Sequence, residues 1–477
     1  MSAEKSRGAG RPLVLRNRNF LLLWGGQVFS QAGTRIYQIA MLWWILGRGA
    51  GSGGRETGLF LVIGALPGIL LVKTIGHTVD RLRTKRLLVV CDLTAFVVTV
   101  VVTVLLRRNQ LPLAGAYLAG FVLALCQAFL DPTMSKAVPE LVEPVDIEAG
   151  VAFQTSTQSL ANFGGAVAGA VLINALGIAG VALVNAVSYL VSSLCSASLK
   201  IKMKPEASAQ PAKPKPGESS EAVPTHRASD KVLGRLQAAD SGLQENAGLR
   251  DPETRSQESE AWSRRLCRDP VPTRMTWAGL AAYPVVRGVL VASAAVNFFA
   301  TPTLVILPLY AKHALGGDAG TLGILEAAVW LGLIVGTFAA SLVTYDRSIA
   351  RLGALGIFVF GLGLFLPGLV IYTSFYVTML LLAGTALGIC NVKFVAMFQQ
   401  QIPAAVKGSF FALMQALISF TFPVAFFLFG VLGDLFSAPH VCLIQGGGTM
   451  ILAAGFLLLI RTERQGPRTG KGSLNHG

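Results

Sequence analysis

Twelve long apolar runs determine what this chain can fold into. An α-helix needs about twenty mostly apolar residues to cross the hydrocarbon core of a bilayer, which is about 30 Å thick. Six runs lie early in the chain, at residues 20–46, 57–75, 87–106, 113–130, 153–175 and 178–199. Six more lie late, at residues 285–309, 322–343, 350–371, 375–398, 410–432 and 441–460. We therefore expect an all-α membrane protein in a lipid bilayer, with twelve transmembrane helices in two pseudo-symmetric six-helix bundles.

Composition and charge support a membrane protein and argue against other classes. Hydrophobic residues make up 53% of the 477 residues and charged residues only 14%, whereas soluble domains have about 25% charged residues. The net charge of +15 would favour nucleic acid in a soluble chain, but these cations flank apolar runs, so we expect no nucleic-acid partner. The six cysteines lack C-x-x-C spacing, and no nucleophile–base pair or phosphate-binding loop occurs. We expect no metal, no cofactor and no enzymatic activity.

Composition divides the chain into five parts. A basic tail covers residues 1–19, the two bundles cover residues 20–199 and 281–461, and a second tail covers residues 462–477. Residues 200–280 are rich in Pro, Ser, Glu, Lys and Ala, so this linker is expected to be largely disordered. The tails and the linker lie on one side of the membrane and hold most of the Lys and Arg residues. The loops on the other side hold only Arg48, Arg55, Arg107, Arg108 and Lys312. The positive-inside rule then predicts that both termini lie in the cytoplasm, and we expect the membrane to be a bacterial inner (cytoplasmic) membrane.

The turn between the second and third runs carries the most specific motif. Gly76, Asp80 and Arg81 form the pattern Gly-x-x-x-Asp-Arg, and Lys85 and Arg86 follow it. Gly76 is expected to let two helices approach closely, and Asp80 to cap or pair at a helix end. The pattern resembles the signature loop of the major facilitator superfamily. The alternative interpretation is an ordinary positive-inside loop.

Further segments resemble one branch of that superfamily, the macrolide-efflux and enterobactin exporters. They are Asn-Arg-Asn-Phe-Leu-Leu-Leu-Trp at 17–24, Ser-Gln-Ala-Gly at 30–33, Ala-Met-Leu-Trp at 40–43, the segment 131–142, and Gln-Ile-Pro at 401–403 before Gly408. The resemblance implies the major facilitator fold, in which two parallel repeats rock around a substrate site at the midplane. It also implies that the first, fourth, seventh and tenth helices line the path. Three positions depart from the pattern of this branch. The chain has Thr34 in place of an acidic residue, Gly165-Ala166 in place of Gly-Pro, and Lys73 in place of an apolar residue. These departures weaken the case for standard proton-coupled drug export.

The first run carries a polar stripe. Gln27, Gln31, Arg35 and Gln38 recur at spacings of four, four and three residues, which places them on one helical face. An arginine at the bilayer centre costs at least ~2.5 kcal/mol on insertion scales, so Arg35 is expected to face a cavity or a partner. The stripe is the best candidate for a substrate path, and the alternative is a structural polar seam between helices.

Other polar residues extend the predicted path. The candidates on the fourth, seventh and tenth runs are Gln127, Asn297, Thr301, Asn391 and Lys393. Glu326 is taken as the only carboxylate well inside a run. It lies at a depth similar to that of Arg35, and it serves either as a protonatable coupling group or as half of a static ion pair. Asp131 and Lys393, from opposite halves, are expected to close the inner gate when the cavity faces outward.

These features predict a transporter. Two cations, Arg35 and Lys393, against one or two acids favour an anionic, zwitterionic or large amphiphilic substrate. We expect a monomeric secondary active transporter, an antiporter of the antibiotic-resistance kind, that exports a small amphiphilic drug, siderophore or other natural product by alternating access, driven by protons. One alternative is a flippase for lysophospholipids or similar lipids. Another is a non-transporting membrane scaffold or sensor that works through the linker.

Overall fold

The computed structural model describes residues 17–48, 51–142, 147–199, 276–343, 349–403 and 406–465. Throughout these ranges the regular elements are helices, and no strand occurs. Residues 200–275 of the predicted linker lie outside the described residues, as do most of the two predicted tails. The part of the linker that is described leads into a short 3₁₀ helix, η2 (Gly279–Ala282).

The first bundle makes six membrane passes. Its helices are α2 (Arg18–Leu46), α3 (Gly54–Leu70), α4 (Val72–Arg81), α5 (Thr84–Arg107), α6 (Leu113–Leu141) and α7 (Ile147–Ala197). Helices α3 and α4 form one pass that bends by 57° at Leu71, which lies between the two helices and has non-helical backbone angles. Helix α7 makes two passes, because Gly177 at its kink has φ +67°, a conformation that glycine adopts without steric cost.

The second bundle makes six further passes. Its helices are α10 (Pro284–Ala300), α11 (Thr303–Leu309), the π-helical turn η3 (Tyr310–Ala314), α12 (Ala319–Ala339), α13 (Ile349–Phe365), η4 (Leu366–Gly368), α14 (Thr373–Gln401), α15 (Lys407–Leu435) and α16 (Ala438–Gln465). Helices α10 and α11 belong to one pass that is interrupted at Pro302. The described helices therefore trace the twelve passes that the sequence predicted.

Not every pass is apolar enough to be identified alone. Eight helices in the described ranges meet a length and hydropathy test for spanning a membrane, or nine if the bent pair α3 and α4 is one span. Helix α2 is not among them, because its polar stripe lowers its mean hydropathy. Its polar side chains are accommodated by burial against other helices, since Gln27 and Arg35 are both buried.

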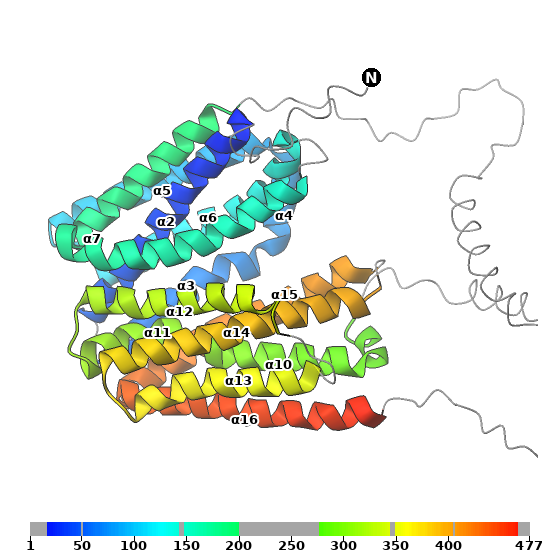
Figure 1. Ribbon diagram of the computed structural model, residues 1–477. Helices are drawn as coiled ribbons and strands as arrows, with labels where there is room; N and C mark the ends of the chain where they lie inside the picture. The colour runs from blue at the N-terminus through cyan, green and yellow to red at the C-terminus, as the bar shows by residue number, and fades with distance from the viewer. Residues whose placement is uncertain are drawn as a thin grey trace, which may run out of the picture. The chain divides into compact units, whose positions relative to one another are not determined.

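The two bundles meet along two helix pairs. Helix α3 packs against α15, and α7 packs against α12, as Figure 1 shows. The α3–α15 contact depends on glycine: a Cβ atom on Gly54 would lie 2.7 Å from the carbonyl oxygen of Gly430, and a Cβ atom on Gly430 would lie 2.8 Å from that of Gly54. Small residues of this kind let helix backbones approach closely within a membrane.

Two ends of the bundles are distinguished below. The tail end is the one where α2 and α5 begin and α6 and α14 end. The latch end is the opposite one, where α2 ends and α3 and α12 begin. Helix α15 also ends there, and its last turn carries Asp434.

Candidate functional site

An ion pair between Arg35 and Glu326 joins the two bundles inside the protein. Arg35 Nη2 on α2 lies 2.5 Å from Glu326 Oε2 on α12, and both side chains are buried. Arg35 Nη1 also donates to Gln38 Oε1 at 2.9 Å, and the guanidinium lies 5.7 Å from the ring centroid of Trp330. The structure therefore confirms the predicted approach of Arg35 to Glu326 and adds Trp330, which the sequence analysis missed.

The local sequence makes room for this pair. A Cβ atom on Gly165 of α7 would lie 2.8 Å from Arg35 Cβ, so glycine at that position lets α7 pack against the arginine stem. Glycine alone is enough for the close contact.

The ion pair is incompletely satisfied. Among the described residues, Arg35 Nε and Glu326 Oε1 have no hydrogen-bond partner. Removing two charges from water is costly, and the attraction between them offsets that cost fully only when the remaining donors and acceptors are also bonded. The Arg35–Glu326 pair therefore leaves part of its desolvation cost uncompensated.

A cavity of about 250 Å³ lies beside the pair. Arg35, Glu326 and Trp330 form one part of its wall, and Thr301 and Thr303 add hydroxyl groups. The other lining residues are apolar or glycine and come from α10, α11, α12, α13, α14 and α15, among them Leu304, Leu307, Phe360, Leu380, Phe422 and Phe426. The cavity combines an apolar wall with one buried ion pair, which suits a ligand with an apolar body and a polar group.

The polar stripe of α2 divides into two parts. Arg35 and Gln38 belong to the ion-pair network. Gln27 instead donates through Nε2 to Ser192 Oγ of α7 at 3.3 Å, within the first bundle. Gln31 lies with Gln27 at a separate small hollow. Gln27 thus contacts α7 within the first bundle, as the alternative interpretation expected of a polar seam, and Arg35 lines the cavity.

The other predicted path residues are less clearly assembled. Gln127 donates to Asp131 Oδ1 at 2.6 Å, and Asn297 donates to the backbone carbonyl of Ser293 at 3.0 Å. Thr301 lines the cavity. Asn391 is exposed and Lys393 half-buried on α14. The pairing of Asp131 with Lys393 stays a prediction.

The signature loop is held to the first bundle by lysines. Lys136 Nζ of α6 donates to the carbonyls of Val79, Asp80 and Leu82 at 2.7, 3.3 and 3.2 Å, which satisfies carbonyls at the end of α4. Lys85 donates to the carbonyl of Leu199 at 3.0 Å. The role expected for Gly76 is wrong in this conformation, because a Cβ atom there would meet no atom within 4 Å.

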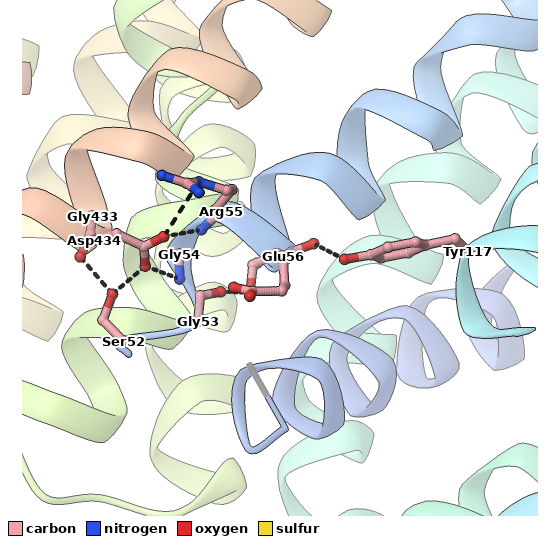
Figure 2. Close-up of polar contacts among 9 residues, drawn as sticks. Ser52, Gly53, Gly54, Arg55, Glu56, Tyr117, Gly433 and Asp434 are labelled. Carbon is pink, nitrogen blue, oxygen red and sulfur yellow. Dashed lines mark hydrogen bonds and ion pairs between the residues drawn. The ribbon is translucent and has the colours of Figure 1, made fainter. Parts of the chain in front are cut away.

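Asp434 closes the latch end. Its carboxylate accepts hydrogen bonds from Ser52 Oγ at 2.6 Å, Gly54 N at 2.8 Å and Arg55 N at 3.1 Å, as Figure 2 shows. Arg55 Nε lies 3.9 Å from it. The site is the N-terminus of α3, where unpaired N–H groups and the helix dipole favour an anion. Asp434 of the second bundle therefore holds α3 of the first.

Further contacts reinforce the latch end. Lys312 Nζ donates to the carbonyl of Leu46 at the end of α2, at 3.1 Å. Asn174 Nδ2 donates to Asp318 Oδ2 at 2.7 Å. Asp318 lies outside the spans, and the backbone N–H of Thr321 that it caps lowers the pKa of its carboxyl. The sequence analysis missed the roles of these residues, because each role depends on a partner in the other bundle.

One expectation about buried charge is wrong. Glu326 is not the only carboxylate well inside a run, because Asp92 of α5 is also fully buried. It is a lone acid in the run 87–106, so the sequence did carry a signal.

The chain belongs to the Major Facilitator Superfamily, whose sequence profile matches residues 23–421. It is therefore a multi-pass membrane transporter of that superfamily. Among relatives, macrolide efflux protein A of Streptococcus pyogenes is 20% identical over 430 residues, which are 90% of this chain and 92% of the relative. The uncharacterized MFS-type transporter YkuC of Bacillus subtilis (strain 168) is 26% identical over 188 residues, covering 39% and 43%. The predicted superfamily is confirmed, and the resemblance to the macrolide-efflux branch is present at low identity.

Solved structures agree with the fold. A bacterial homologue of the iron transporter ferroportin matches with a TM-score of 0.64 at 12% identity, covering 93% of this chain and 98% of that one. The POT family transporter PepTSo matches with a TM-score of 0.64 at 13% identity, covering 94% and 99%. At these identities the likeness shows the fold alone.

Proposed function

We propose that this protein is a secondary active transporter that exports a small amphiphilic compound by alternating access, coupled to protons. The observation that carries the proposal is the Arg35–Glu326 ion pair, which joins the two bundles at the edge of a largely apolar cavity. The likeness to macrolide efflux protein A over most of both chains supports efflux.

The orientation of the protein in the membrane is inferred from the distribution of its charged residues. The tail end carries the basic loop Arg81, Arg83, Lys85 and Arg86, whereas the latch end carries few cations, so the tail end lies in the cytoplasm of a bacterial inner-membrane protein. Asp434, Lys312 and Asn174 join the bundles at the outer face. This conformation is then closed to the outside.

Glu326 is the proposed coupling group. A polar or cationic group of a zwitterionic or amphiphilic substrate can bond the Glu326 carboxylate beside Arg35, and a proton on that carboxylate would remove its charge and displace the substrate. Loss of the ion pair weakens the connection between α2 and α12, which favours separation of the bundles at the outer face. Protonation and substrate release are thus linked through one residue pair.

Flux in proteoliposomes tests the proposal. A pH gradient is imposed, and uptake of anionic and amphiphilic compounds, a macrolide included, is compared for the parent protein, Glu326→Gln and the exposed-site control Glu140→Gln. We expect Glu326→Gln to lose accumulation driven by the gradient while it keeps downhill exchange. Equal, gradient-driven accumulation by all three would overturn the role of Glu326.

One observation favours a second candidate, a flippase for lysophospholipids or similar lipids. An open groove of about 960 Å³ runs along α7, α12 and α14, with apolar walls and with Asn174, Asp318 and Thr321 at its latch end. Such a groove accepts an acyl chain along its length and a polar headgroup at its end. Val171→Trp narrows this groove from an exposed position on α7, away from the ion pair. Loss of lysophospholipid movement with unchanged macrolide export in that variant would favour the flippase.

A further inference from the structure

Asp92 is a buried carboxylate that the proposed mechanism does not use. It lies eight residues from the start of α5, about 12 Å into the helix, and its side chain is 0% exposed. Its Oδ2 accepts a hydrogen bond from Ser192 Oγ at 2.7 Å. Its Oδ1 has no hydrogen-bond partner among the described residues. One hydroxyl is thus the only donor to this carboxyl group in the described part of the chain.

Among the residues that the structure describes, no cation compensates the charge of Asp92. The titratable groups that face Asp92 are the thiols of Cys91, Cys126 on α6 and Cys195 on α7, together with the phenol of Tyr189 on α7. Within the described ranges Asp92 forms no ion pair. An ionised carboxylate is costly in such a place, whereas the neutral acid is not. The geometry therefore fits a carboxylic acid that carries its proton.

A polar chain connects Asp92 to α2. Ser192 Oγ, which donates to Asp92, accepts from Gln27 Nε2 at 3.3 Å. Gln27 and Gln31 border a hollow of about 10 Å³ next to Trp24 and Met134, which is close to the volume that one water molecule needs. The chain Asp92–Ser192–Gln27 thus ends at a place where a water molecule fits.

Helix packing closes this chain in the present conformation. A Cβ atom on Gly26 of α2 would lie 3.1 Å from Cys195 Cβ and 3.3 Å from Ser192 Cα, so α2 and α7 are in tight contact beside Ser192. A small shift of α2 relative to α7 would open the polar chain to water.

We propose that Asp92 is a second proton-binding site of this transporter, which keeps its proton while α2 and α7 are in contact and exchanges it through the Gln27–Gln31 hollow when they separate. The step transfers one proton from the carboxyl oxygen to a water molecule and leaves a carboxylate that Ser192 stabilises. Asp92 lies toward the tail end, whereas Glu326 lies about 10 Å from the latch end of α12. The two acids would serve opposite halves of the membrane. Proton binding by Asp92 stands on its own, and only its use in transport rests on the proposed function.

Infrared spectroscopy of the full chain in liposomes tests proton binding without any substrate. At neutral pH we expect a protonated-carboxyl C=O band that is lost in Asp92→Asn and kept in Glu140→Gln. In Ser192→Ala, the loss of the hydroxyl next to Asp92 should move the band, and this variant keeps the test valid if Asp92→Asn fails to fold. A spectrum unchanged in Asp92→Asn, or in Ser192→Ala, overturns the proposal.

Proton counting tests the use of that proton. With a radiolabelled macrolide as probe, we expect Asp92→Asn to keep downhill exchange and to move one proton fewer per macrolide than the parent protein. An unchanged ratio in a variant that has lost the band assigns Asp92 a structural role and overturns its role in transport. If no variant moves the macrolide, the proposed function fails with this probe, and the infrared result still decides whether Asp92 binds a proton.

Discussion

At the scale of single residues, the balance between burial and charge explains which side chains matter. Arg35 and Glu326 are both buried and each keeps one nitrogen or oxygen atom without a hydrogen bond in the described structure. Asp92 is buried with a single donor. Asp434 is different, because three donors at a helix N-terminus satisfy it. Arg35, Glu326 and Asp92 are therefore suited to change their charge or hydrogen-bond partner. Asp434 is suited to keep α3 and α15 together.

Removing one member of the Arg35–Glu326 pair should cost more than removing both. In Arg35→Ala, Glu326 is left buried without its cation, which costs about 3–5 kcal/mol of folding stability. In Arg35→Met with Glu326→Leu, no unpaired charge remains, so most of that stability should return while transport stays lost. Thermal unfolding of the purified variants measures both. A double variant as unstable as Arg35→Ala would show that the unpaired charge of Glu326 is not the cause of the lost stability.

At the scale of helices, glycine contacts and the hydrogen bonds of Asp434 determine how the two bundles pack against each other. The α3–α15 seam has backbone against backbone at Gly54, Gly58 and Gly430. Asp434 then fixes the N-terminus of α3 to the end of α15 (Figure 2). Seams of this kind hold strongly when closed and lose most of their contacts when the helices separate by a small distance.

Gly58→Leu should open the seam. Its Cβ atom would lie 2.5 Å from the carbonyl oxygen of Phe426, and overpacking typically costs about 1–3 kcal/mol. Gly64→Leu on the same helix is the matched control, because a Cβ atom there meets nothing within 4 Å. We expect a lower thermal midpoint for Gly58→Leu only. Equal midpoints for the two variants would contradict the seam.

Asp434→Ala should make buried residues at the latch end accessible to water. Hydrogen bonds to a charged group contribute about 1.5–3 kcal/mol each, so their loss should raise the population of the outward-open form at least about tenfold. The probe is Leu309→Cys, a buried position in contact with Gly433, labelled by a membrane-impermeant maleimide. Glu140→Gln serves as the control. If Leu309→Cys is labelled no faster with Asp434→Ala than with the control, the hydrogen bonds of Asp434 do not keep the latch end closed.

At the scale of the whole molecule, the sequence predicts the twelve passes and one buried pair, and the reason is that both follow from local pattern. Hydropathy marks the spans, and helical rise places Arg35 and Glu326 at the same depth. Asp434, Lys312 and Asn174 carry no local signal, since their importance depends on the partner bundle. Asp92 did carry a signal but was overlooked, and Gly76 was misinterpreted because a glycine near a helix end can be free of close contacts.

The predicted inner gate belongs to this scale, because it joins opposite bundles in a conformation other than the present one. Asp131→Lys and Lys393→Asp should each reduce transport strongly by placing like charges together. Combining them should restore a large part of the rate, because opposite charges face each other again. Flux in proteoliposomes measures all three variants. Failure of the double variant to recover would exclude this gate.

Distances between the bundles test alternating access most directly. Spin labels at Arg108 and Leu435 report on the latch end, and labels at Arg83 and Gln400 report on the tail end, in a chain whose native cysteines have been replaced. As the pH is lowered in liposomes, we predict that the latch-end distance lengthens while the tail-end distance shortens, and that Glu326→Gln removes the pH dependence. Distances that stay fixed at both ends across pH, or that change together in one direction, would contradict a proton-coupled exchange between two states.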